Sequence, residues 1–196
     1  MKTILYLHGF ISSPASRKAV MLGDYVRGQA PGVEYVVPAL HHRPAEAIAQ
    51  VHAICDERHP ADLLVVGSSL GGFYATVAAE RAGCRAVALN PAVHPQRHFE
   101  RYLGPQQNLH TGERFDLTPG HVAELAAIDP PALTRPDRYW LIVETGDEVL
   151  DYREAVAYYA GAFQSVVQGG DHAPAPSSPR PAPPSRSRPP TASAPR

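Results

Sequence analysis

Hydrophobic residues gather in short runs along the chain, and the stretches between these runs have the spacing of amphipathic helices. The apolar runs predict strands at residues 4–7, 34–37, 63–66, 86–89, 140–144 and 165–167. The stretches between them predict helices at residues 16–30, 45–58, 71–82, 119–127 and 152–161. Apolar strands that alternate with helices are typical of a parallel sheet covered on both faces. The pattern therefore predicts an α/β fold with a doubly wound, mainly parallel sheet of about six strands.

Composition divides the chain into two parts. It has 196 residues, of which 44% are hydrophobic, and this is enough for one sizeable core. After His172 the composition changes, because residues 173–196 contain nine prolines and four arginines but no acidic, aromatic or branched aliphatic residue. Such a segment cannot bury enough apolar surface to offset the entropy lost on ordering. We expect one folded domain at residues 1–172 and a disordered tail at residues 173–196.

Charge and cysteine content exclude several classes of partner. The formal net charge of −1 gives no basic field for nucleic acid or an anionic membrane. His8 and Gly9 interrupt the first apolar run, and no later run reaches the roughly 18 apolar residues of a membrane span. Cys55 and Cys84 form no CxxC motif, which favours reduced thiols. We expect a cytoplasmic protein that acts on a small molecule.

The strongest motif is a G-x-S-x-G sequence between Gly67 and Gly71. It follows the apolar run at residues 63–66 and precedes a predicted helix, which is the context of a nucleophile on a tight strand-to-helix turn. Such a turn is strained, and its flanking positions pass so close to other segments that glycine is required. Ser69 is the predicted nucleophile, and Ser68, which lacks symmetric glycine flanks, is the weaker candidate. The alternative is a glycine-rich turn that binds phosphate or only packs tightly.

A serine nucleophile needs a base, and chain order selects one among the ten histidines. Hydrolases with this motif place serine, acid and histidine in that order, and His172 is the only histidine after position 121. The loop after residues 140–144 supplies the acid, for which we choose Asp147 because it directly follows a glycine. Asp151 is the alternative, with helix capping as its other role. Glu148 is expected to face solvent.

Two backbone amides could stabilise the oxyanion that forms during acyl transfer. One is the N–H of Leu70 after the nucleophile, and the other is the N–H of Phe10 in the loop after the first strand. We also predict that Phe73 and Tyr102 bind substrate. The excursion at residues 90–117 is a candidate lid and acyl-pocket wall, and a surface excursion without substrate contact is the alternative.

The remaining histidines show no spacing typical of metal ligands, so we expect neither a metal site nor a cofactor. We interpret His41, His42, His94, His98, His110 and His121 as surface or loop residues.

Taken together, the motifs resemble the small bacterial YqiA-like esterases of the α/β-hydrolase superfamily. The similar segments are residues 5–10, 12–14, 66–76, 90–93, 102–104, 145–152, 155–160 and 169–173. The resemblance implies a catalytic domain of the α/β-hydrolase fold with a minimal lid, and hydrolysis of a carboxylic ester or an acyl thioester. It maps the family's triad onto Ser69, Asp147 and His172. Peptidase or acyltransferase activity on the same triad stays open, because motif residues define the chemistry and not the leaving group.

The chain departs from the YqiA-like pattern directly after His172. Family members continue with an aromatic-rich amphipathic helix that packs on the sheet, which the sequence from Pro174 onward cannot supply. We therefore expect the C-terminal helix to be missing or altered and apolar sheet surface to stay exposed, which favours homo-oligomers. The alternative function is that of a catalytically impaired binding module on the same scaffold.

Overall fold

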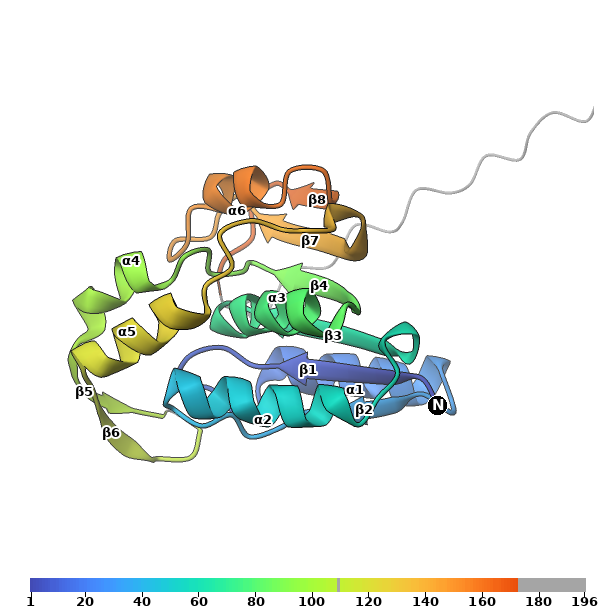
Figure 1. The fold of residues 1–196 in the computed structure, drawn as a ribbon, viewed down its shortest axis with the longest axis horizontal. Helices are drawn as coiled ribbons and strands as arrows, with labels where there is room; N and C mark the ends of the chain where they lie inside the picture. Colours follow the sequence, from blue (N-terminus) through green and yellow to red (C-terminus); the bar gives the residue numbers. More distant parts are fainter. Residues whose placement is uncertain (109, 173–196) are drawn as a thin grey trace, which may run out of the picture.

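A parallel sheet of six strands forms the centre of the molecule (Figure 1). The computed structural model describes residues 1–108 and 110–172. The strands are β1 Thr3–Leu7, β2 Glu34–Val36, β3 Leu63–Ser68, β4 Arg85–Leu89, β7 Tyr139–Glu144 and β8 Phe163–Val167, in the spatial order β2-β1-β3-β4-β7-β8. Every neighbouring pair is parallel. The predicted α/β sheet is confirmed, and the predicted tail at residues 173–196 lies outside the described residues.

Helices cover both faces of this sheet. The five that the sequence predicts are α1 Arg17–Gln29, α2 Pro44–Asp56, α3 Leu70–Ala82, α5 Pro119–Ile128 and α6 Tyr152–Tyr158. Successive side chains of a strand point to opposite faces. In β1, Leu5 therefore packs into the main core with α2 and α3, whereas Tyr6 packs with Ala19 of α1 on the other face. No helix in the described part of the chain is long and apolar enough to cross a membrane.

The excursion between β4 and β7 contains elements that the sequence pattern did not predict. They are the short helix α4 Gln96–Phe99 and an antiparallel pair of strands, β5 Gly104–Gln107 and β6 Arg114–Leu117. The strand β5 has no hydrophobic alternation, and it contains Pro105, which lacks a backbone donor. The strand forms because β5 pairs with β6, and the hydrophobic pattern within a short segment does not indicate which other segment it pairs with.

Among the residues that the structure describes, part of one sheet face beyond α1 is apolar and exposed. Trp140 in β7 is paired in register with Val87 in β4, which belongs to the α1 side of the sheet. The neighbouring Phe163 in β8 is paired with Trp140, and their ring centroids are 5.6 Å apart. Trp140 is 42% exposed, Phe163 67% and Val167 46%. The sequence predicted exposed apolar sheet surface, and these side chains are exposed among the described residues; the segment after His172, to which the prediction of a missing or altered helix applies, lies outside them.

Candidate active site

The predicted site residues meet at the carboxyl end of the sheet. In parallel α/β sheets, ligands bind where the loops after neighbouring strands diverge. Here the loops after β1 and β3 line an open cleft of about 790 Å³. Ser69, His172, Phe10 and Leu70 all contribute to its wall.

Ser69 occupies the strained turn that the motif predicted. Its backbone has φ of 57° and ψ of −124°, and residues other than glycine rarely adopt a positive φ. A Cβ on Gly67 would lie 2.0 Å from the carbonyl oxygen of Gly71, and a Cβ on Gly71 would lie 2.1 Å from that of Leu7. Both glycines are therefore required for the chain to turn from β3 into α3. The turn places the Ser69 side chain in the wall of the cleft.

The predicted acid and base are in direct contact. The Oδ2 atom of Asp147 lies 2.8 Å from Nδ1 of His172, and the Asp147 side chain is only 2% exposed. Its other oxygen, Oδ1, accepts the N–H groups of Val149 and Leu150, each at 2.9 Å. The carboxylate is therefore fixed on both oxygens. Nε2 is the ring nitrogen that His172 would use as a base.

Backbone contacts join the loop that carries the acid to the loop that carries the histidine. Gly146 N–H donates to the carbonyl of Gly169 at 2.9 Å, and Gly169 N–H donates to Oγ1 of Thr145 at 3.0 Å. Glu148 is exposed, as expected, but its carboxylate also accepts the N–H of His172 at 3.1 Å. This bond, the largest contribution, lowers the pKa of Glu148. These hydrogen bonds join the loop after β7 to the loop after β8.

Asp151, the alternative acid, is occupied elsewhere. It is the N-cap of α6, and its Oδ1 accepts the N–H of Arg153 at 3.0 Å. The structure therefore brings Asp147, and not Asp151, to His172.

The two residues whose amides are predicted to hold the oxyanion, Leu70 and Phe10, line the same cleft as Ser69. Leu70 is the first residue of α3, where a backbone N–H has no acceptor within its own helix. A Cβ on Gly9 would lie only 3.7 Å from Oγ of Ser69, so the loop that leads to Phe10 passes close to the hydroxyl. Leu70 and the residue before Phe10 therefore both adjoin the proposed nucleophile.

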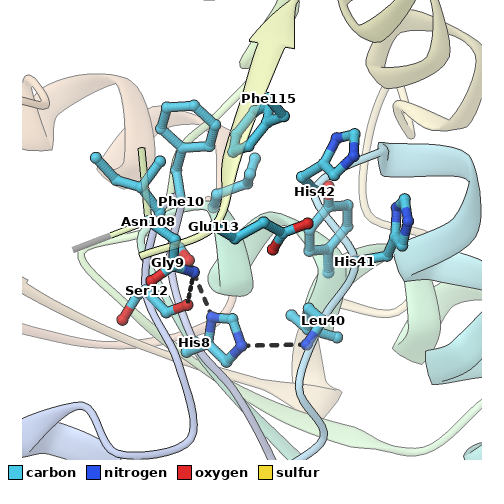
Figure 2. A pocket seen from close by; sticks show the side chains of 13 residues that line it. His8, Gly9, Phe10, Ser12, Leu40, His41, His42, Asn108, Glu113 and Phe115 are labelled. Atoms are coloured by element: carbon cyan, nitrogen blue, oxygen red, sulfur yellow. Dashed lines mark hydrogen bonds between the residues drawn. The ribbon is translucent and has the colours of Figure 1, made fainter. Parts of the chain in front are cut away.

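His8 holds this second loop, a role that the sequence analysis did not assign. Leu40 N–H donates to its Nε2 at 3.2 Å, so Nδ1 carries the hydrogen and donates to the carbonyl oxygen of Gly9 at 3.0 Å. Figure 2 shows the ring between these two partners. Burial, the largest cause, lowers the pKa of His8 and favours the neutral form that this pattern needs. The only sign of this role in the sequence is that His8 and Gly9 directly precede Phe10, the predicted oxyanion donor.

Aromatic side chains form much of the apolar wall. Phe10, Phe99 and Tyr102 all line the cleft, with ring centroids 5.0 Å apart for Phe10–Phe99 and 5.7 Å for Phe99–Tyr102. Phe73 does not line it and is 3% exposed in the main core, so its predicted place in the substrate site is wrong. Residues 70–79 of α3 are all buried, which directs the Phe73 ring into the protein.

Comparison with known proteins assigns the family. A model described as Uncharacterised protein family (UPF0227) matches residues 3–178. The chain belongs to this family. The UPF0227 family is the YqiA family, so the resemblance seen in the sequence is confirmed. A UPF0227 protein of Yersinia enterocolitica is 31% identical over 149 residues, which cover 76% of this chain and 77% of the relative.

Another relative and a solved structure extend this result. A UPF0227 protein of Vibrio atlanticus is 25% identical over 97 residues, which are 49% of this chain, so the match spans about half of that relative (54%). Alpha/beta hydrolase domain-containing protein 10 from mouse has a TM-score of 0.65 at 17% identity, covering 87% of this chain and 81% of the mouse chain. The fold of this UPF0227 member is therefore that of the α/β hydrolases.

The other histidines of this UPF0227 member correct one expectation. His121, interpreted as a surface or loop residue, is 6% exposed and lies in α5. Its side chain caps that helix together with Thr118, and its Nε2 lies 3.2 Å from Nδ1 of His42. Among the described residues, no group of three or more His, Cys, Asp or Glu side chains is placed to hold a metal ion.

Proposed function

We propose that this protein is a serine hydrolase that cleaves carboxylic esters or acyl thioesters through an acyl-enzyme intermediate. The observation that carries the proposal is the strained Ser69, which shares a cleft with a His172 ring bound to the buried Asp147. Strained backbone of this kind persists at nucleophiles because the surrounding structure holds it. The reaction needs no cofactor, and the expected partner is a small-molecule substrate.

In the proposed mechanism, each residue has a distinct role. His172 removes the proton of the Ser69 hydroxyl, and Oγ attacks the carbonyl carbon of the substrate. Asp147 keeps the proton on Nδ1 and stabilises the imidazolium. The amides of Phe10 and Leu70 donate to the oxygen that becomes negative. The intermediate expels the alcohol or thiol, which receives the proton from His172, and water then releases the acyl group by the same steps.

The apolar wall favours an acyl chain as the group bound beside Ser69. Tyr102 remains a proposed substrate-binding residue, and Phe99 takes the place that was predicted for Phe73. Both belong to the excursion after β4, which acts as the wall of the acyl pocket in this proposal. Apolar side chains around a few directed polar groups are typical of small-molecule sites.

Hydrolysis of a panel of p-nitrophenyl esters and acyl-CoA thioesters tests the proposal. We expect turnover by the purified protein and its loss in Ser69→Ala. A fluorophosphonate probe, which labels activated serines, should label the wild type and Ser68→Ala but not Ser69→Ala. A folded wild-type protein without turnover or labelling would refute the proposal.

The exposed sheet face supports a second candidate, a catalytically impaired scaffold that acts by binding. Trp140 and Phe163 are exposed at the amino ends of β7 and β8, the two strands whose following loops carry Asp147 and His172. A folded wild-type protein without turnover would favour this candidate. For either function we propose a cytoplasmic location, which fits the two buried free cysteines.

A further inference from the structure

Lys18 lies beside the proposed catalytic residues, although none of the steps above uses it. It belongs to the first turn of α1, and its side chain lines the same cleft as Ser69 and His172. Its Nζ lies 3.2 Å from the carbonyl oxygen of His172 and 3.4 Å from Oγ of Ser68. Lys18 therefore joins α1 to the loop of the proposed base and to the residue before the proposed nucleophile.

Three side chains hold His172, and each binds a different group. Glu148 accepts its backbone N–H at 3.1 Å, and Lys18 donates to its carbonyl oxygen at 3.2 Å. Asp147 binds its ring at 2.8 Å. Both carboxylates come from the loop after β7, whereas Lys18 ties His172 to a separate element, the helix α1.

Several carboxylates lie near the ammonium group of Lys18. Burial lowers the pKa of its ammonium group, and the carboxylates of Glu144, Asp147 and Asp171 act in the opposite direction. These carboxylates also lie around the loop of His172, together with Glu148. The ammonium group thus offsets negative charge close to the place where the imidazolium would form.

We propose that Lys18 is a positioning residue, which holds the His172 backbone in the cleft that Ser69 also lines and balances the carboxylates around the imidazole. The inference rests on the proposed hydrolase function and deepens it. Because the contact acts on the base and not on the substrate, its removal affects kcat more than KM.

The test compares Lys18→Met, which removes the charge, with Lys18→Arg, which keeps it. The pH profile of kcat/KM is measured with a p-nitrophenyl ester. We expect Lys18→Met to lower kcat about tenfold or more, since small misplacement of a catalytic group has effects of this size. The acid limb of the Lys18→Met profile should move to higher pH, because no ammonium charge then offsets the carboxylates around the imidazole. Lys18→Arg should keep the limb in place. Arg27→Met, at the other end of α1, is the control for loss of a cation.

The outcomes separate this inference from the proposed function. A role in stability alone would lower the melting temperature of Lys18→Met without moving the acid limb, and this would overturn the inference. The inference would also be overturned if Lys18→Met had the same pH profile and kcat as the wild type, while Ser69→Ala abolished turnover. If wild-type turnover does not depend on Ser69, the hydrolase proposal fails and the inference fails with it.

Discussion

The imidazole of His8 donates to the carbonyl oxygen of Gly9 at 3.0 Å, and this contact sets the direction of the next peptide N–H. In a trans peptide, the carbonyl oxygen and the following N–H point to opposite sides. A fixed Gly9 carbonyl therefore fixes the Phe10 N–H, one of the two proposed oxyanion donors. The same ring accepts the Leu40 N–H, so the loop after β1 is anchored to the segment before α2.

Two substitutions at His8 separate its two contacts. Asparagine places an amide near the Nδ1 position and can still donate to Gly9, whereas glutamine places its amide near Nε2 and keeps only the Leu40 contact. We expect His8→Gln to lower kcat roughly 10- to 100-fold, because loss of a whole oxyanion donor costs about 10²- to 10³-fold. His8→Asn should lose less. Steady-state kinetics of both variants would contradict the assignment if His8→Gln were the more active.

Isosteric substitutions distinguish the two acid candidates. Asp147→Asn should lower kcat by about 10³- to 10⁴-fold, because an amide no longer holds the imidazole in the required tautomer. Asp151→Asn should change neither kcat nor stability appreciably, since asparagine caps a helix as well as aspartate does. Kinetics and thermal unfolding of the pair check both statements. A larger loss of kcat in Asp151→Asn than in Asp147→Asn would identify Asp151 as the acid.

The sequence could predict the features of the candidate site that depend on local backbone geometry. Gly67 and Gly71 flank Ser69 because the turn itself excludes a Cβ on either side, so the motif carries the geometry. The order of serine, acid and histidine along the chain predicted His172, and the structure places its ring against Asp147. The contact between Lys18 and His172 joins residues 154 positions apart, and no local pattern contains it.

The wrong prediction for Phe73 has a physical origin in α3. The helix is buried on nearly all sides, so its sequence has no polar face that would show which residues point toward the cleft. Phe99 lines the cleft from a helix of only four residues, which is too short for a periodic signal. In both cases tertiary packing decides the direction of the ring.

Glycine-to-alanine substitutions test the tight turn. Gly67→Ala and Gly71→Ala place a Cβ about 2 Å from backbone oxygen, so we expect each to destabilise the protein by about 3 kcal/mol. Gly28→Ala is the matched control in α1, where no atom lies within 4 Å of the added Cβ. It should raise stability by about 0.5–1 kcal/mol through helix propensity. Urea unfolding measures all three, and equal effects would contradict the argument.

Histidines in buried or half-buried positions predict a loss of stability on the acid side. His121 accepts the Thr118 N–H on Nδ1 at 3.1 Å, so its Nε2 donates to Nδ1 of His42, and both rings must be neutral. Burial, the largest cause, lowers the pKa of both below the ordinary value of 6.5, and His8 and His52 are shifted the same way. The unfolded chain therefore binds more protons, so the free energy of unfolding falls as the pH drops below 6.5.

Urea unfolding between pH 5 and 8 measures this slope. His121→Asn removes one titrating ring and should flatten it, because fewer groups then differ in pKa between the folded and unfolded states. A slope unchanged by that substitution would show that the His42–His121 contact does not contribute.

The exposed rings of β7 and β8 predict self-association. Phe163 and Trp140 form a contiguous apolar surface, and a net charge of −1 provides little repulsion between copies. Burial of one phenylalanine ring contributes about 1.5–3 kcal/mol. Phe163→Lys should therefore raise the dissociation constant of the oligomer at least about tenfold, as measured by analytical ultracentrifugation over a range of concentrations. Leu103→Lys is the control, because Leu103 is 42% exposed but lies outside this face. A wild-type protein that stays monomeric at every concentration would show that a second copy does not cover the face.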